Sequence, residues 1–338
     1  MQFSPKPTGM ESSQTQLQFF QHIRSILPEH ISLVDEIAGL LDISNDSAYR
    51  RIRGEKQISL DEMQKLSVHY KISIDQFLNL QSNSYVFSGE LAASGEYVFE
   101  QWMENVLQQL TFMGSFAHRH MYYLAKDIPI MEQFMVPELL AFKSFLWRRS
   151  ILQYASMKGS KFSLADADPA HLEMGRKVVE AYMRIPSTEI WNLETINSTI
   201  RQIEFYREAN MFKAEEDVKK IYIGLIGLLD HLELQAEAGT KFLPGSKPGT
   251  GLAYNLFWND LVTADNTILA ELDLRKITFL NHSVINFIST TDIQFNSFMF
   301  GNMQNLIKRS TQLSQVGEKE RYRFFNRLRD KMKLAARL

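Results

Sequence analysis

The chain has 338 residues, a formal net charge of −2 at pH 7 and 45% hydrophobic residues. This length exceeds what a single hydrophobic core usually serves, so the sequence predicts two domains. With no cysteine, the chain has neither disulfides nor thiolate metal ligands. The longest purely apolar run, Ile221 to Leu229, is far shorter than a membrane-spanning helix, and we expect a cytoplasmic protein with no membrane partner.

Residues 1–14 are polar and contain prolines. They lack the apolar core of a signal peptide and are expected to be disordered. From about Thr15 to Leu27, apolar residues recur at helical spacing until Pro28 ends the run. We interpret this run as the first helix of an N-terminal domain that extends to residue 80.

Serines divide residues 32–80 into short helical runs. Each of them precedes a stretch with apolar residues at helical spacing, where its hydroxyl can accept from N–H groups of the first turn. Two of them are followed three residues later by Glu62 and Gln76, which completes a capping box. Helices this short are unstable alone, so they must share one core. The four serines are Ser32, Ser44, Ser59 and Ser73.

Residues 44–54 (SNDSAYRRIRG) have the features of a recognition helix. A tight turn at residues 42–44 precedes the helix, its first turn is small and polar, and a glycine ends it. Asn45, Asp46 and Arg50 are spaced so that they share a face. Arginine and asparagine suit base edges, because they make paired hydrogen bonds to guanine and adenine.

Residues 32–80 resemble the lambda-repressor-like (XRE/Cro-type) helix-turn-helix family, and DSAYRRIRGE within them resembles its bacterial BetR-type variant. The similarity lies in an apolar second helix ending in LLDIS, a recognition helix closed by Gly54, and the following SLDEMQKLSVHYKISIDQFL. The resemblance implies a helical bundle that binds double-stranded DNA, with the recognition helix in the major groove. The residues that it implies as base-reading are Asn45, Asp46, Tyr49 and Arg50.

The chain departs from the family pattern at two positions of this helix. Ala48 stands where a larger aliphatic residue is usual and Arg51 where an apolar one is usual, so Ile52 is expected to take over that packing. Arg53 and Lys56, near the helix end, suit phosphates rather than bases. The predicted DNA-contacting set is Ser44, Asn45, Asp46, Ser47, Tyr49, Arg50, Arg51, Arg53 and Lys56.

The charge of this region does not by itself favour DNA. Residues 32–80 hold six basic and eight acidic side chains, a net charge of −2, whereas nonspecific DNA binders are usually basic. The DNA interpretation therefore depends on placement, with three arginines in four positions of one helix. The alternative is a solvated charged face, or a head that binds protein.

After a predicted linker at residues 81–95, the sequence predicts a mostly helical domain over residues 96–338. Residues 118–130 (HRHMYYLAKDIPI) are the exception and favour a strand, and residues 239–251 favour a flexible loop. The helix candidates are Tyr97 to Met113, Glu138 to Tyr154, Pro169 to Met183, Trp191 to Asn210 and Ala214 to Ala238.

Short runs rich in Ile, Leu, Phe and Thr between residues 254 and 289 predict hairpins of a small sheet. The expected fold class is therefore mainly α: a helix-turn-helix bundle followed by a large helical domain with a small β-sheet near residues 254–289. The strand candidates are Tyr254 to Asp265, Thr267 to Asp273, Lys276 to Asn281 and Val284 to Ser289.

From Asp292 the pattern is helical again, and residues 308–338 hold ten basic and three acidic side chains. Apolar residues spaced along one side of this segment favour a helix docked on the body with a solvated basic face. Extra phosphate contacts beside the head are an alternative, and a helix on a membrane surface is another.

No catalytic motif or cofactor fingerprint is recognisable, so we expect no enzyme activity, no catalytic residue and no cofactor. The loop between Gly245 and Gly251 lacks the order of a phosphate-binding loop and favours a connector. His118 and His120 would face the same way on a strand, but a metal site would need a third ligand, and no metal is expected.

These features predict a sequence-specific DNA-binding transcriptional regulator that acts as a homodimer on two half-sites. Residues 96–338 would sense a small-molecule or peptide effector or hold the dimer together. The domain order also resembles regulators of the Rgg type, from which the sheet predicted at residues 254–289 departs. The alternatives are a ligand-binding or enzymatic body with a regulatory head, and a protein–protein interaction module.

Overall fold

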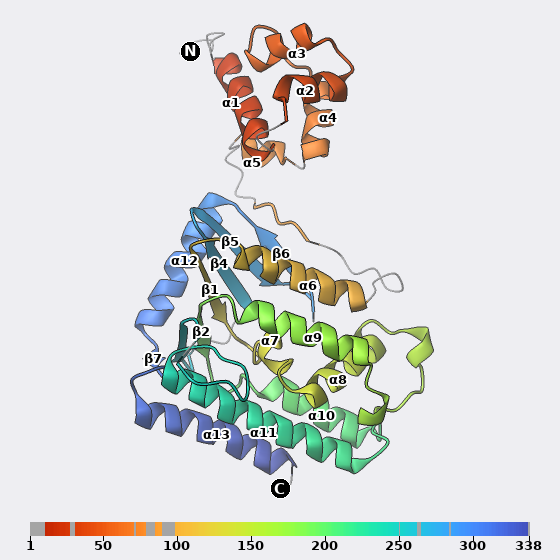
Figure 1. Ribbon diagram of the computed structural model, residues 1–338, viewed down its shortest axis with the longest axis vertical. Coiled ribbons are helices and arrows are strands. Elements are labelled where there is room, and N and C mark those ends of the chain that lie inside the picture. The colour runs from red at the N-terminus through yellow and green to blue at the C-terminus, as the bar shows by residue number, and fades with distance from the viewer. Residues whose placement is uncertain are drawn as a thin grey trace, which may run out of the picture. The chain divides into compact units, whose positions relative to one another are not determined.

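The computed structural model describes residues 11–27, 31–70, 72–78, 85–89, 99–249, 251–261, 265–283 and 285–336. Its contacts divide the chain into two units, Met1–Val86 and Phe87–Leu338, called here the head and the body (Figure 1). Residues 1–10 of the predicted disordered segment lie outside the described residues, and the first helix begins at Glu11. Most of the predicted linker also lies outside them.

The described part of the head is a bundle of helices around one small core. Phe19, Phe20, Ile37 and Leu66 are completely or almost completely buried in it, as their helical spacing predicts. The helices are α1 (Glu11–Ile26), α2 (Leu33–Leu41), α3 (Asn45–Ile52), α4 (Leu60–Tyr70) and α5 (Ile74–Phe77).

Three of the predicted serine caps set where these helices begin. Ser32 Oγ accepts from Asp35 N at 3.4 Å, and Ser44 Oγ accepts from Ser47 N at 3.3 Å. The capping box at Ser59 is complete, because Glu62 N donates to Ser59 Oγ at 3.1 Å and Ser59 N donates to Glu62 Oε2 at 2.9 Å. Local sequence signals therefore fix the start of α2, α3 and α4.

The body is built on a seven-stranded mixed sheet with strand order β6-β5-β4-β1-β2-β3-β7. The prediction of a mainly helical fold with a small sheet is therefore wrong, and the fold is α/β. β1, β2 and β3 run parallel at the centre, while β4, β5, β6 and β7 pair antiparallel. The strands are β1 (Arg119–Leu124), β2 (Ser187–Trp191), β3 (Tyr254–Trp258), β4 (Thr267–Leu272), β5 (Arg275–Asn281), β6 (Phe287–Thr290) and β7 (Thr311–Gln312).

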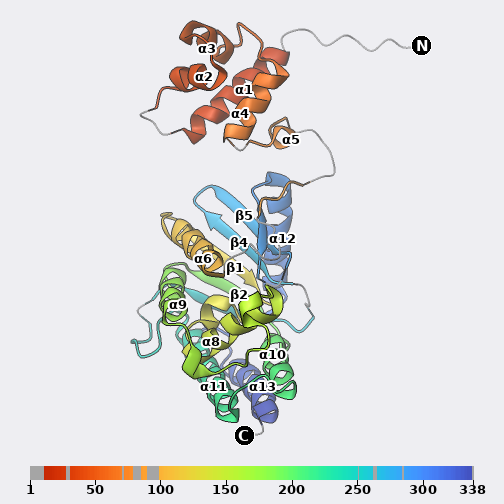
Figure 2. The same cartoon turned by 90° about the vertical axis from the view of Figure 1, so that its right-hand side faces the viewer.

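Helices cover both faces of the sheet, as Figure 2 shows. On β1, Met121 and Tyr123 face the large core of the body. The alternate residues Tyr122 and Leu124 face α12 (Ile293–Lys308) through a smaller cluster. This alternation is the period of two expected of a strand covered on both sides.

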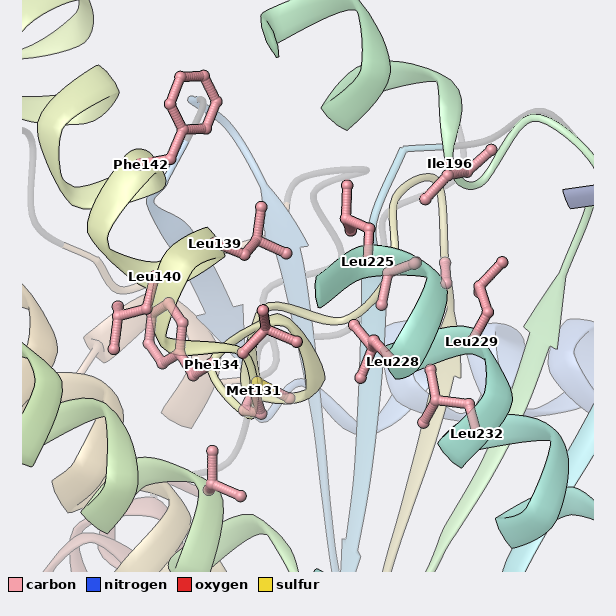
Figure 3. Close-up of a cluster of buried hydrophobic side chains, with 14 of the residues drawn as sticks. Met131, Phe134, Leu139, Leu140, Phe142, Ile196, Leu225, Leu228, Leu229 and Leu232 are labelled. Atoms are coloured by element: carbon pink, nitrogen blue, oxygen red, sulfur yellow. The ribbon is translucent and has the colours of Figure 1, made fainter. Parts of the chain in front are cut away.

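The large core lies between the sheet and the remaining helices. α6 packs on α9, and α11 packs on α8 and α13, as the neighbouring ribbons in Figure 1 show. In Figure 3, leucines of α11 gather with side chains of α7 and α8. These helices are α6 (Phe99–Gly114), α7 (Ile130–Gln133), α8 (Pro137–Leu146), α9 (Pro169–Tyr182), α10 (Asn197–Glu208), α11 (Glu215–Ala238) and α13 (Glu318–Ala336), with a π-helical turn at Trp147–Ile151.

The hairpins predicted between residues 267 and 289 are confirmed as the β4-β5-β6 meander. β3 is different, because it pairs in parallel with β2 and not with β4. The strand predicted within residues 118–130 is confirmed as β1. The sequence did not predict β2, which precedes a stretch interpreted as helix from Trp191 onward.

The basic C-terminal segment is a docked helix, as predicted. Phe324, Phe325 and Leu328 of α13 are fully buried against the body. Arg329 Nε donates to Asp230 of α11 at 2.7 Å, and its guanidinium also pairs with Glu233. No helix within the described ranges is both long and apolar enough to cross a membrane.

Glu189 and Glu132 are two buried carboxylates of the body with very different surroundings. Glu189 of β2 accepts from Tyr182 Oη, from Ser187 Oγ at 3.0 Å and from Trp191 Nε1 at 2.9 Å. Glu132 of α7 is also fully buried, yet neither of its carboxylate oxygens has a hydrogen-bond donor among the described residues. Burial, reinforced by the charge of Glu189, raises the pKa of Glu132 well above its usual value.

Lys241 completes this buried group of charges. Its Nζ lies 3.2 Å from the centroid of the Tyr182 ring and has no hydrogen-bond acceptor within the part of the chain that is described. Burial lowers the pKa of Lys241 to about 7, although Glu189 and Glu132 oppose the change. The group therefore contains two carboxylates and one amine whose proton is weakly held.

Candidate nucleic-acid interface

A three-residue turn joins α2 to α3 and fixes the direction of α3. Asp42 ends α2 in the left-handed conformation, with φ 55° and ψ 52°, where glycine or asparagine is more usual. Ile43 N donates to Ala38 O at 3.0 Å, and Ser44 then begins α3. Because so few residues separate the helices, α3 has little freedom to change its angle to α2.

The inner face of α3 is tied to the rest of the head. Ala48 packs in the core, and only 6% of Arg51 is exposed. Arg51 Nη2 and Nε donate to the two carboxylate oxygens of Glu62 at 2.6 and 3.1 Å, while Nη1 donates to Ser47 O at 3.1 Å. This paired geometry is the strong form of an arginine–carboxylate contact. It fixes α3 against the beginning of α4.

Gln16 of α1 secures the chain that follows α3. Its Nε2 donates to Arg51 O at 2.7 Å and to Lys56 O at 2.8 Å, and its Oε1 accepts from Ile58 N at 3.0 Å. One amide thus satisfies three backbone groups over the segment that ends the helix. The position of the segment depends on α1 as well as on the local turn.

The pKa of Glu62 is lowered, above all by the hydrogen bonds from Arg51. A carboxyl with a lowered pKa in the folded state stabilises the head at pH values above its unfolded pKa. That contribution is lost as the pH falls through the folded value. The ion pair is therefore intact at neutral pH and is lost only in acid.

The outer face of α3 presents polar and basic side chains to solvent. Asp46, Tyr49, Arg50 and Arg53 are exposed and recur at helical spacing. The Arg53 guanidinium carbon lies 5.4 Å from the centroid of the Tyr49 ring, and Arg53 Nε lies 3.5 Å from a carboxylate oxygen of Glu55. These contacts keep Tyr49 and Arg53 together at the C-terminal half of the face.

The structure brings most of the predicted DNA-contacting residues onto one surface but separates Arg51 from them. Ser44 uses its hydroxyl as the cap of α3, and Asn45 Nδ2 donates to Asp35 Oδ1 at 2.8 Å. Ser47 is half-buried and Lys56 is exposed beyond the helix end. Arg51 points inward and is not available to DNA while it is bound to Glu62.

Sequence reasoning missed the two residues that hold the interface in place, Gln16 and Glu62. A signal for Glu62 was present, because it completes the capping box that begins at Ser59, but that signal does not reveal its bonds to Arg51. Gln16 lies 35 residues from Arg51, and no local pattern marks it. The supports of a surface are harder to find in sequence than the surface itself.

No family model, curated protein or solved structure matches this chain. Among the described residues, no group of three or more His, Asp or Glu side chains is arranged to hold a metal ion. His120 Nε2 lies 2.8 Å from Thr188 Oγ1, and burial lowers the pKa of His120 to about 4. His120 is therefore uncharged at neutral pH and forms a hydrogen bond with Thr188 of the neighbouring strand β2.

Proposed function

We propose that the chain is a sequence-specific DNA-binding transcriptional regulator of the cytoplasm, and that α3 enters the major groove. The observation that carries this proposal is the two-sided character of α3. Its inner face is fixed by Arg51 and Ala48, while its outer face presents a tyrosine and two arginines. A rigid helix with an exposed polar face of these residue types suits the reading of base edges.

The positions of the exposed side chains on α3 and just beyond it suggest that some contact bases and others contact phosphates. Arg50 is exposed on the outer face and would bond to guanine, whereas Arg53 and Lys56 at the helix end would contact phosphates. Asn45 would need to exchange its bond with Asp35 for one to adenine. Tyr49 would add an apolar contact or a phosphate contact.

A single head of this size forms a small interface, so strong specificity would require a homodimer on two half-sites about one helical turn apart. The body would hold the dimer together or sense an effector, since it is a compact unit of its own.

One observation favours a second function: the net charge of −2 over residues 32–80 suits a head that binds a basic protein surface.

Selection from a pool of random duplexes tests the proposal. The full-length protein would be challenged over several rounds at near-physiological salt, and the enriched duplexes titrated by fluorescence anisotropy. Enrichment of an inverted repeat is the expected result. If no sequence is enriched and binding disappears with modest salt, the contact is nonspecific attraction and the protein-binding function becomes the better account.

Two substitutions on α3 should weaken DNA binding in different ways. Arg50→Ala is expected to cost about 1–3 kcal/mol on the selected duplex and to relax the preference at one base pair. Lys56→Ala should weaken binding to all duplexes alike and reduce the slope of log affinity against log salt by about 0.9. Anisotropy titrations at several salt concentrations measure both effects.

Arg275→Ala, at an exposed arginine of the body, is the matched control and should bind as the unchanged protein does. Equal binding by Arg50→Ala and the control would show that α3 does not read the duplex.

A further inference from the structure

One face of the central sheet is covered by α12 alone among the described helices. Phe300 and Met303 of α12 pack against Leu124, Ile190 and Leu269, which belong to three neighbouring strands. The other side chains of this small core also come only from α12 and from strands. Figure 2 shows α12 on the side of the sheet opposite α6 and α9. The described body therefore packs one side of α12 and leaves its outward side bare.

The outward side of α12 carries no charge over about four turns. Residues 293–307 contain no Asp, Glu, Lys or Arg, although 22% of the whole chain is charged. Only three of the 16 residues of α12 are buried. By comparison, α13 has six buried residues among 19, and ten of the 19 are charged. A helix that faces water over most of its surface normally carries charges there, so α12 is exposed without the composition of a solvated helix.

A continuous uncharged stripe follows the outermost line of α12. Its members are four, three and four residues apart, which places them on one side of the helix. Phe298 stands within the stripe and is 64% exposed, and Ile293 at its flank is 85% exposed. This spacing is also that of the seam along which two helices pack. The stripe consists of Gln294, Phe298, Gly301 and Asn305.

Gly301 is not explained by packing within the chain. A Cβ at this position would meet no atom within 4 Å, so the fold of the body does not require a glycine there. Glycine weakens the interior of a helix, yet it allows another backbone to approach closely. A second helix that crosses α12 at Gly301 would account for it.

The absence of charge restricts what can cover this face. Nucleic acids and anionic membrane surfaces are recognised by lysine and arginine, and a charged protein surface would need charges of the opposite sign. Another copy of the same face brings no like charges together. Its amides, at Gln294 and Asn305, both donate and accept hydrogen bonds, so identical stripes can pair across a two-fold axis.

We propose that the outward face of α12 is the homodimer interface of the body, with Phe298 and Gly301 at its centre. The helix is about 24 Å long, and the seven-stranded sheet beneath it is about 30 Å wide. On either side of α12, the half-buried Phe257 and Leu280 lie on the same face of the sheet. A face of these dimensions is comparable with the roughly 800 Å² that each partner buries in a stable interface.

Charges on the strands beside α12 are compatible with such an interface. Lys276 Nζ lies 3.7 Å from a carboxylate oxygen of Glu271 and 4.6 Å from the centroid of the Phe300 ring. The two charges compensate each other, and the lysine stem covers an aromatic ring. The surface that surrounds the stripe therefore adds no net charge from this pair.

The proposed interface lies beside the point where the chain enters the body. Phe87, the first residue of the body, packs edge-on against Phe295 at the start of α12, with the ring centroids 5.2 Å apart. Dimerisation through α12 would bring the two entry segments to the same interface. That this arrangement serves two heads on two half-sites rests on the proposed function, whereas the dimerisation itself does not.

Sedimentation equilibrium of the full-length protein, without DNA, tests the proposal. The expected result is a particle with twice the mass of one chain, which dissociates on dilution. Because no DNA is present, a failure of the head to bind duplexes would not change this result. A monomer at every concentration would overturn the proposal.

Phe298→Lys is the decisive variant, since each dimer would then hold two unpaired charges in an uncharged contact. It should raise the dissociation constant of the dimer at least about tenfold. Phe205→Lys, at a 60% exposed phenylalanine of α10, is the matched control and should dimerise as the unchanged protein does. Both side chains are largely exposed, so both variants are expected to fold, which tryptophan fluorescence checks.

A second measurement uses the absence of cysteine from the chain. Asn302→Cys on the outward side of α12 should react with maleimide more slowly at concentrations where the dimer forms than after dilution. Gln101→Cys on the exposed side of α6 should react at the same rate at both. A dimer that Phe298→Lys does not weaken, or an Asn302→Cys rate that does not depend on concentration, would assign dimerisation to another surface and overturn the proposal.

Discussion

Arg51→Ala is expected to unfold the head, whereas the same change at the neighbouring Arg50 should leave it folded. Removing the Arg51 guanidinium leaves the Glu62 carboxylate with the Ser59 N–H as its donor and takes the side-chain donor from the Ser47 carbonyl. Breaking a largely buried pair in this way costs about 2–4 kcal/mol. Because domains this small are only marginally stable, that loss is a large part of what holds the head together.

Hydrogen exchange of head amides in the full-length protein measures this effect. All four tryptophans lie in the body, so their fluorescence reports independently that the body stays folded. The double variant Arg51→Met with Glu62→Gln keeps an acceptor in the capping box and replaces the buried ion pair by an apolar side chain. It should recover most of the lost stability. Equal protection in Arg51→Ala and Arg50→Ala would contradict the structural role given to Arg51.

Glutamine in place of Glu132 and in place of Glu189 should change the stability of the body in opposite directions. Glu132→Gln is expected to stabilise the body at pH 7, because the carboxylate that it replaces has no hydrogen-bond donor among the described residues. Glu189→Gln is expected to destabilise the body by roughly 2–4 kcal/mol. One of the three donors to Glu189 would then face an amide N–H. Lys241 would also lose the negative charge of Glu189 that opposes the lowering of its pKa.

The change in the free energy of unfolding with pH shows whether Glu132 stabilises or destabilises the body. The folded pKa of Glu132 lies well above the unfolded value, so the folded state holds a proton that the unfolded state releases. The free energy of unfolding therefore falls as the pH rises above about 4.5. Below pH 7 the amine of Lys241 stays mostly protonated in both states and adds little slope. The advantage of Glu132→Gln should therefore grow between pH 5 and pH 7.

Urea unfolding followed by tryptophan fluorescence at both pH values measures these differences. Groups distant from Glu132 titrate alike in the two proteins and cancel in the comparison. A Glu132→Gln protein whose advantage is the same at pH 5 and pH 7 would show that Glu132 is ionised in the folded body and has a partner there.

Sequence patterns predicted correctly where three helices of the head begin, because the signals for a helix start are local. A serine before a helix acts on N–H groups two or three residues away, so Ser32, Ser44 and Ser59 could be recognised without the fold. The direction of Arg51 could not be settled in the same way. Its inward placement depends on Glu62, which the turn after α3 brings alongside.

The central sheet was missed because its key strand does not alternate in polarity. β2 reads STEIW and is buried at every position. Tyr182, Ser187 and Trp191 donate hydrogen bonds to Glu189 that no spacing reveals. β3 then lacked its true neighbour and was assigned to a hairpin. Parallel pairing joins segments some 67 residues apart, as Ser187 and Tyr254 show, and only the fold brings them together.

A cavity lined by side chains of α6, α7 and α8 could not be predicted for a similar reason. Trp102, Gln133 and Lys143 come from separate helices, and each is unremarkable in its own stretch of sequence. Isolated glutamines and lysines are normally solvated, so their burial beside one another was not expected. A cavity assembled in this way becomes visible only once the helices are packed.

The edge strands of the sheet affect whether the body aggregates at high protein concentration. A long bare outer strand is a template for strand addition and, in time, for fibrils. Here the outermost strand beside β3 has only two residues, and four-residue β6 is occupied by Ser88, whose N–H and carbonyl both bond to Ser289 at 2.7 Å. Both margins therefore resist extension by another copy. We expect the body to withstand high concentration without fibril growth, and any dimer to form through helical surfaces.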